Sequence, residues 1–223
     1  MKLLVFGATG GVGAALCRAA AARGDRVTAF VRSRARLPAD VAAALAGVVE
    51  GDATDAKAVA AAIGGDAAAF DAVLVAIGGA GIMARDHIRS TSTKNIVAAM
   101  AAAPGAPFAA PLAGGGARLV VCSSMGVNES LPWIPSFIAW MLNHALADHG
   151  EQEDAVRASP LPFVIARPTG LSNDAASAAG VRKVLAGAVP VSRVARADVA
   201  RFMLDCLGSG EFVGKAVGIC APA

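Results

Sequence analysis

The chain contains no tyrosine, and only 4% of its 223 residues are aromatic. The absence of tyrosine excludes every reaction mechanism in which a phenol donates or accepts the proton. Charged residues are also scarce, at 17% against a usual figure of about 25%. No stretch of about 18 residues is apolar without glycine or charge, which argues against a membrane-spanning helix. The hydrophobic share of 56% reflects abundant alanine instead.

Cysteines and clustered charges are equally sparse. The four cysteines are widely spaced, so the sequence shows neither a disulfide framework nor a metal-binding C-x-x-C motif. Glycines near the N-terminus interrupt the apolar core that a secretory signal peptide needs, and together with the scattered cysteines this leads us to expect a cytoplasmic protein. Because the three histidines are not clustered either, we expect no metal site. The net charge of +3 is dispersed, which argues against a nucleic-acid partner.

Short apolar segments alternate with helix-forming segments along the chain. We expect strands at residues 2–6, 27–31, 48–49, 71–77, 118–122, 163–166 and 216–220. We expect helices at residues 14–22, 41–46, 56–63, 86–103, 133–157, where Gly150 is a candidate break, and 198–207. Because each parallel crossover needs a helix, this order predicts an α/β fold with a doubly wound, mostly parallel sheet and helices on both faces. We expect one domain over residues 1–223, with a small substrate-side region at about 168–223.

A glycine-rich segment, Gly7-Ala8-Thr9-Gly10-Gly11-Val12-Gly13, lies where the first expected strand meets the first helix. In this position a glycine-rich turn forms the site for a dinucleotide. Gly7 permits the tight turn, Gly10 lets the backbone approach a pyrophosphate, and Gly13 brings the helix close to the sheet. The free N–H groups and the dipole of the helix then hold the anion.

These residues and several later segments resemble one family. GATGGVG is similar to the glycine motif of the atypical and extended short-chain dehydrogenase/reductases, above all their NAD(P)-binding, NmrA-like and biliverdin/flavin-reductase-like branch. Further matching segments are Gly51–Asp55, Arg167-Pro168, Ser192-Arg193, Ala197–Ala200 and the helix end from Glu153 to Ser159. The resemblance covers about residues 1 to 220 and implies a Rossmann domain that binds NAD(P)(H).

Arg32 follows the second expected strand, at the position that selects the cofactor. An acidic residue there accepts a hydrogen bond from the ribose 2′-OH of NAD, whereas an arginine pairs with the 2′-phosphate of NADP. We therefore expect NADP(H) in preference to NAD(H), with Arg34 or Arg36 as a second contact or as part of a solvated helix start. The resemblance implies further cofactor contacts from Asp52, Ala53, Ala76, Ile77, Gly78, Ser123, Arg167, Pro168 and Thr169. An alternative role for Asp52 is that of a loop carboxylate, which accepts hydrogen bonds from backbone N–H groups instead of contacting the cofactor.

The usual proton relay of the resembled family, a tyrosine with a lysine four residues later and an assisting serine, cannot operate in this chain. Ser124 matches the serine best, although Ser123 and Met125 compete for the position. His149 stands where many relatives carry the lysine, and it is our candidate general acid because histidine titrates near neutrality. His144 is an alternative general acid, and His87 is a less favoured one. A surface or helix-capping role is the alternative for His149.

Hydride transfer itself needs no protein acid, because the nicotinamide carries the reactive hydrogen. One apolar segment could line the substrate pocket, or it could simply pack a helix against the rest of the domain. Its large side chains are Trp133, Ile134, Phe137, Trp140 and Met141. We therefore expect an NADP(H)-dependent reductase of a planar conjugated or carbonyl acceptor that works without a Tyr/Lys pair. The alternative is a non-catalytic NADP(H) sensor or scaffold of NmrA-like type. The expected partner is a small molecule, and the alanine-rich helices also allow a homo-oligomer.

Overall fold

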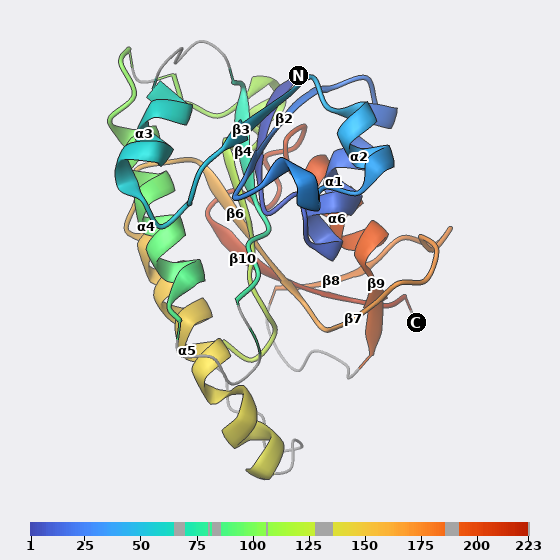
Figure 1. Cartoon of the computed structure of the whole chain (residues 1–223). Coiled ribbons are helices and arrows are strands. Elements are labelled where there is room, and N and C mark those ends of the chain that lie inside the picture. Colours follow the sequence, from blue (N-terminus) through green and yellow to red (C-terminus); the bar gives the residue numbers. More distant parts are fainter. Residues whose placement is uncertain are drawn as a thin grey trace.

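The structure is a computed structural model with a central sheet between two layers of helices (Figure 1). It describes residues 1–64, 70–79, 81, 86–105, 107–127, 136–185 and 192–222, with the backbone alone for 136–142. Within these ranges no helix is long and apolar enough to cross a lipid bilayer.

The elements follow the alternation expected from the sequence. The strands are β1 (Lys2–Phe6), β2 (Arg26–Val31), β3 (Gly47–Glu50), β4 (Ala72–Val75), β5 (Leu119–Cys122), β6 (Phe163–Pro168), β7 (Gly170–Ser172), β8 (Arg182–Val184), β9 (Arg193–Ala195) and β10 (Lys215–Cys220). The helices are α1 (Gly11–Ala22), α2 (Ala39–Ala44), α3 (Ala56–Gly64), α4 (Ile88–Ala101), α5 (Ser136–Arg157) and α6 (Arg196–Asp205). All the expected elements are present, while β7, β8 and β9 were not expected.

The helix α5 runs through Gly150 without a break. The interpretation of Gly150 as a helix divider is therefore wrong. A single glycine costs a helix about 1 kcal/mol relative to alanine, which is a small penalty for a long, well-packed element. Gly150 is buried, and α5 packs along α4, so tertiary packing outweighs that cost.

The described strands form an eight-stranded sheet in the order β3-β2-β1-β4-β5-β6-β10-β8. The strand pairs from β3 to β10 are parallel, and only β8 pairs antiparallel, with β10 at one edge. A separate two-stranded sheet joins β7 to β9. The strand order reverses between β1 and β4, so a crevice opens there at the carboxyl ends of the strands. The doubly wound, mostly parallel fold expected from the sequence is confirmed.

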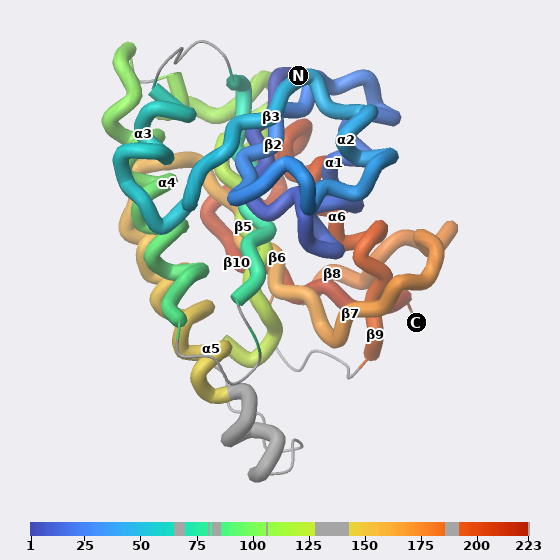
Figure 2. The backbone as a smooth tube through the Cα atoms, in the orientation of Figure 1, coloured from blue at the N-terminus to red at the C-terminus, as the bar shows by residue number. Residues whose placement is uncertain are grey.

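The two faces of the sheet carry separate cores. Leu3 and Val5 of β1 belong to the core shared with α1, α2 and α6, whereas Leu4 and Phe6 belong to the core shared with α3, α4 and α5. This assignment follows from the period of two along a strand. Figure 2 shows the two helix layers on opposite sides of the sheet.

The four cysteines are unpaired and buried, and they lie in different elements of the fold. Cys17 lies on α1, Cys122 ends β5, Cys206 follows α6 and Cys220 ends β10. Burial raises the pKa of Cys17, Cys122 and Cys206 to about 12. These three thiols are therefore protonated at neutral pH and unreactive toward electrophiles while the fold is intact.

Candidate functional site

The turn between β1 and α1 can be built only with glycine at two positions. Gly7 has φ +88°, and a Cβ there would overlap the carbonyl oxygen of Ala76 in the chain segment after β4. A Cβ on Gly13 would overlap the carbonyl oxygen of Gly7. Gly7 thus allows the left-handed turn, and Gly13 lets α1 approach the turn closely.

The N-terminus of α1 is open to an anion. Gly10 precedes the helix without a side-chain capping bond, and no acidic residue occupies the first turn. The free N–H groups and the positive end of the helix dipole therefore face the space above the turn. Ala8 and Val12 are buried in the core instead, so their side chains support the turn from below. This arrangement fits the diphosphate of a dinucleotide.

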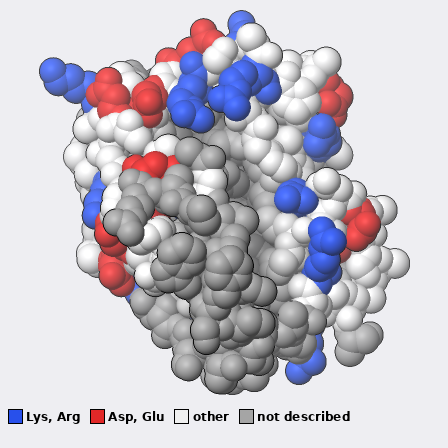
Figure 3. Space-filling model, turned by 60° about the horizontal axis from the view of Figure 1, so that its bottom comes forward, with Lys and Arg blue, Asp and Glu red and all other residues white. Residues whose placement is uncertain are grey.

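A cleft of about 670 Å³ lies over the carboxyl ends of the strands beside this turn. Figure 3 turns this edge of the molecule forward and shows basic side chains in the upper part of the view, with acidic side chains beside them. The cleft brings together many of the residues that the sequence indicated: Gly7, Thr9, Gly10, Arg32, Arg36, Asp52, Ala53, Ile77 and Gly78. It is also lined by residues that the sequence did not indicate: Gly79, Asp86, Ile88, Thr91 and Ser92.

One end of the cleft is formed by the segments after β2 and β3. Arg32 and Arg36 both line it, while the backbone N–H of Arg34 donates to the Glu50 carboxylate at 2.5 Å. The Asp52 carboxylate accepts the N–H and the hydroxyl of Thr54 at 2.9 and 2.7 Å. These two bonds, with a smaller contribution from the positive charge of Arg32, lower the pKa of Asp52. Asp52 therefore acts at least as the loop carboxylate considered above.

The helix α4 closes the same end of the cleft. The Asn95 amide donates to the carbonyl oxygens of Ala53 and Thr54 at 3.1 and 3.0 Å, which fixes the segment after β3 against α4. Ser92, one turn before Asn95, is fully buried, and its hydroxyl has no hydrogen-bond partner within the described part of the chain. Among the described residues that line the cleft, Ser92 thus carries an unsatisfied hydroxyl.

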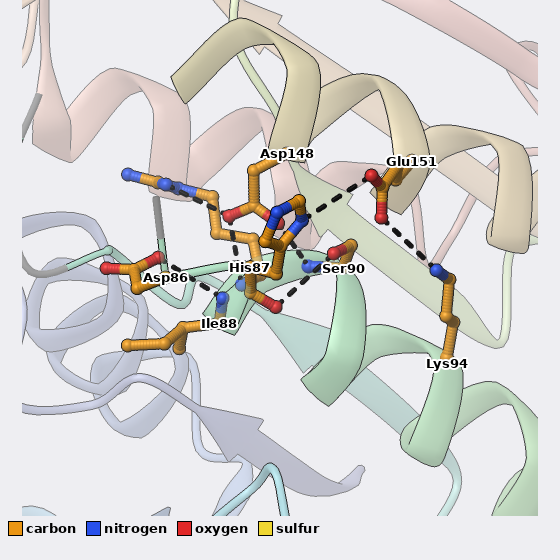
Figure 4. A network of polar contacts seen from close by, with 8 residues as sticks. Asp86, His87, Ile88, Ser90, Lys94, Asp148 and Glu151 are labelled. Carbon is orange, nitrogen blue, oxygen red and sulfur yellow. Dashed lines mark hydrogen bonds and ion pairs between the residues drawn. The ribbon is translucent and has the colours of Figure 1, made fainter. Parts of the chain in front are cut away.

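The start of α4 is held by a carboxylate from α5 (Figure 4). Asp148 accepts the backbone N–H groups of Arg89 and Ser90 at 3.2 and 2.9 Å and a guanidinium N–H of Arg89 at 3.2 Å. Burial alone would raise the pKa of Asp148, but these hydrogen bonds outweigh burial and lower it. His87, directly before the helix, adopts φ +46°, in the left-handed region that non-glycine residues seldom occupy. Asp148 therefore fixes the point at which the chain leaves the cleft and enters α4.

The two candidate catalytic residues do not meet in the cleft. The Ser124 hydroxyl, just after β5, donates to the carbonyl oxygen of Met125 at 3.1 Å. His149 lies on α5, where its Nδ1 is 3.0 Å from Oε1 of Gln152. Burial, together with the nearby charge of Arg89, lowers the pKa of His149 to about 4, so the imidazole is neutral at pH 7. Neither side chain lines the cleft within the described residues, and their catalytic roles stay predictions.

Ser123 and Arg167 bind a buried carboxylate. Glu153 of α5 is 1% exposed and accepts the Ser123 hydroxyl at 2.7 Å. Arg167 of β6 donates to both Glu153 oxygens, from Nε at 2.8 Å and from Nη2 at 2.7 Å. Sequence reasoning placed both residues at the cofactor, but it missed this pairing. The bonds join α5 to β5 and β6, and none of the three residues is among the described residues that line the cleft.

The segment after β6 forms another set of backbone contacts. Pro168 ends β6, and the N–H of Thr169 donates to the carbonyl oxygen of Ile219 at 2.9 Å. The predicted cofactor contacts of Pro168 and Thr169 stay predictions. The apolar side chains expected to form a substrate pocket, from Trp133 to Met141, lie outside the part of the chain whose side chains the structure describes.

Comparison with known proteins agrees with this geometry. A family model described as NAD(P)H-binding matches residues 7–209. The solved structure of the anaerobilin reductase ChuY from Escherichia coli O157:H7 is 25% identical over 100% of this chain and 98% of its own, with a TM-score of 0.76. The oxidoreductase ylbE from Lactococcus lactis is 18% identical over 100% and 91% of the two chains, with a TM-score of 0.77.

A third solved structure contains a cofactor. A short-chain dehydrogenase/reductase from Veillonella parvula DSM 2008, in complex with NADP, is 17% identical over 99% of this chain and 94% of its own, with a TM-score of 0.73. The resemblance to atypical short-chain dehydrogenase/reductases is thereby confirmed, as is the oxidoreductase-like Rossmann fold. The open N-terminus of α1, the two required glycines and the match over residues 7–209 together show that this chain belongs to the NAD(P)H-binding family.

Proposed function

We propose that the chain is an NADP(H)-dependent oxidoreductase that reduces a planar conjugated or carbonyl acceptor without a Tyr/Lys pair. The observation that carries the cofactor preference is the position of two guanidinium groups, Arg32 and Arg36, at one end of the cleft. A guanidinium fork matches the geometry of a phosphate and pairs with it bidentately. An acidic residue, which NAD-dependent sites place after the second strand, is replaced here by Arg32.

Within the described residues neither Arg32 nor Arg36 forms an ion pair with a carboxylate, although the charge of Arg32 acts on Asp52. Asp52 is engaged by Thr54, and Glu50 accepts the backbone N–H of Arg34. Arg32 and Arg36, which both line the cleft, are therefore the cofactor-selecting residues of this proposal. Replacing Arg32 with aspartate should abolish the preference for NADP(H), because a carboxylate repels the 2′-phosphate and accepts a hydrogen bond from a free 2′-OH.

The catalytic step that fits this chain needs no side-chain acid. A bound reduced nicotinamide supplies a hydride, and the electron pair leaves the nicotinamide with it. The acceptor takes up the balancing proton from water, since the chain has no tyrosine and His149 is neutral at pH 7. The Ser124 hydroxyl, just after β5, is the candidate donor of a hydrogen bond to the acceptor, in exchange for its bond to the carbonyl oxygen of Met125. The role of the protein is then to position the two reactants and exclude competing reactions.

Two measurements test this proposal. Calorimetric titration should show tighter binding of NADP⁺ than of NAD⁺, and Arg32→Asp should abolish the difference. Absorbance of the reduced nicotinamide should decrease with time when NADPH is mixed with protein and a flavin, quinone, biliverdin or aldehyde. Equal affinities for the two cofactors in the unaltered protein would refute the assigned role of Arg32. Tight NADPH binding without oxidation by any of these acceptors would refute the reductase.

A non-catalytic NADP(H) sensor or scaffold, as in NmrA-like proteins, is the second candidate. It is favoured by the occupied hydrogen-bonding groups of the two expected catalytic residues: the Ser124 hydroxyl donates to the carbonyl oxygen of Met125, and Nδ1 of His149 lies 3.0 Å from Oε1 of Gln152. A sensor should bind NADP(H) without turnover and capture a partner protein in only one redox state of the cofactor. We further propose that the chain acts in the cytoplasm, whose reducing environment matches its unpaired cysteines.

A further inference from the structure

A side chain from the distant helix α6 lies against the first turn of α1. Arg196, the first residue of α6, passes so close to Gly11 that a Cβ on Gly11 would overlap the Cδ and Nε atoms of the arginine. Gly11 does not have the positive φ that would by itself favour glycine. A side chain at position 11 would therefore displace the Arg196 side chain from its place over the helix start.

The surroundings of Arg196 favour an anion. Its Nη1 donates to Oδ1 of Asn173 at 2.7 Å, and Asn173 is neutral. Within the described residues Arg196 forms no ion pair with a carboxylate, whereas the nearby Arg18 is paired with Asp40. A cation in the first turn of a helix is normally unfavourable, because the helix dipole is positive there. Arg196 occupies this position on α6 and also lies beside the positive end of α1. Asp198, in the same first turn of α6, is negatively charged, but its buried carboxylate accepts the backbone N–H of Ser177 and forms no ion pair with Arg196 within the described residues.

The hollow beside Arg196 adjoins the cofactor cleft. It has a volume of about 410 Å³ and is lined by Thr9, Gly10, Gly11, Asn173 and Arg196, among others. Thr9 and Gly10 line the cleft as well, so the two spaces share the turn that binds the diphosphate. Asp174 also lines the hollow, where its carboxylate provides the only negative charge among the described lining residues.

We infer that Arg196 is a diphosphate-binding residue of the cofactor site. The guanidinium donors that Asn173 does not use donate to the phosphate oxygens held above the N-terminus of α1, and Asn173 acts as a positioning residue. This inference rests on the proposed NADP(H) function. Since Asn173 directly follows β7, the same contact connects the bound diphosphate to the small sheet of β7 and β9.

The test compares two ligands that differ in the diphosphate. NADP⁺ contains the diphosphate and the 2′-phosphate, whereas 2′-AMP contains only the 2′-phosphate. Calorimetry on Arg196→Met should show NADP⁺ binding weakened roughly tenfold or more, since a hydrogen bond to a charged group contributes about 1.5–3 kcal/mol. Binding of 2′-AMP should be unchanged. Arg196→Lys should lose less affinity for NADP⁺ than Arg196→Met, because it keeps the charge.

Two further variants complete the design. Arg201→Met removes an exposed arginine from the same helix and should leave both affinities unchanged. Asn173→Ala leaves Arg196 in the chain but removes the side-chain oxygen that holds its guanidinium in place, and it should weaken NADP⁺ binding severalfold. Unaltered NADP⁺ affinity in Arg196→Met would overturn the inference, as would an equal loss for 2′-AMP. If the unaltered protein binds neither NADP⁺ nor 2′-AMP, the proposed function fails instead. Thermal unfolding midpoints confirm that each variant is folded.

Discussion

The unsatisfied hydroxyl of Ser92 leads to a prediction of unusual sign: its removal should stabilise the protein. Ser92 is fully buried on α4, and its hydroxyl has no partner in the described part of the chain. A buried polar group without a hydrogen bond costs about 1–3 kcal/mol. Alanine also has a higher helix propensity than serine, by about 0.5 kcal/mol. After allowance for the small void that remains, Ser92→Ala should raise the free energy of unfolding by about 1–2 kcal/mol.

Ser90→Ala is the matched control, since it makes the same change on the same helix at an equally buried position. The Ser90 hydroxyl donates to the carbonyl oxygen of His87 at 3.3 Å, so its loss should cost about 0.5–1.5 kcal/mol. The assay is urea unfolding of the cofactor-free protein, supported by thermal unfolding. In a chain of this length each kcal/mol shifts the midpoint by about 2–4 °C. Destabilisation by Ser92→Ala, similar to that by Ser90→Ala, would refute the assignment of an unsatisfied hydroxyl.

Three other predictions concern stability. Glu153→Ala should lower the free energy of unfolding by about 3–5 kcal/mol in urea titrations, because it removes the buried carboxylate that accepts the Ser123 hydroxyl and two guanidinium bonds of Arg167. A loss below about 1 kcal/mol would contradict that pairing. Gly13→Ala should cost about 1–3 kcal/mol in the same assay, because the new methyl group overlaps the carbonyl oxygen of Gly7; an unchanged denaturation midpoint would show that α1 can move away. His149 has a pKa of about 4 in the folded protein, against an ordinary value of 6.5. Between these two pH values the unfolded chain binds more protons than the folded protein, so the free energy of unfolding should fall as the pH decreases from about 6.5 to about 4. Replacement of His149 by glutamine should reduce that slope, and an identical pH profile would show that the imidazole is not buried.

The sequence predicted those parts of the fold that depend on local patterns. Continuous apolar runs such as 71–77 identified the buried parallel strands, and their alternation with helix formers led to the doubly wound sheet. The strands β7, β8 and β9 were not predicted, because each has three residues and a pairing partner far away in the sequence. Gly170, for example, pairs with Arg193, and no local pattern records that contact.

The site was predictable where it follows from the strand ends. Arg32, Asp52 and Gly78 each come just after a strand, and parallel strands bring such residues to one edge. The lining residues of α4 were missed because they depend on where the helix begins. A sequence feature that could have identified these residues is the run of four hydroxyl side chains from Ser90 to Thr93, because such a run is unusual in a helix that packs against a sheet. The pairing of Glu153 with Ser123 and Arg167 depends on tertiary contact alone.

The four buried cysteines provide a built-in way to follow transient opening of the molecule. A thiol-specific reagent reacts only with a thiolate that solvent can reach, so labelling of each cysteine measures how often its surroundings open. Cys17, Cys122, Cys206 and Cys220 lie on or beside α1, β5, α6 and β10. Variants that retain one cysteine at a time would show whether the helix above the glycine turn and the far edge of the sheet open together or separately.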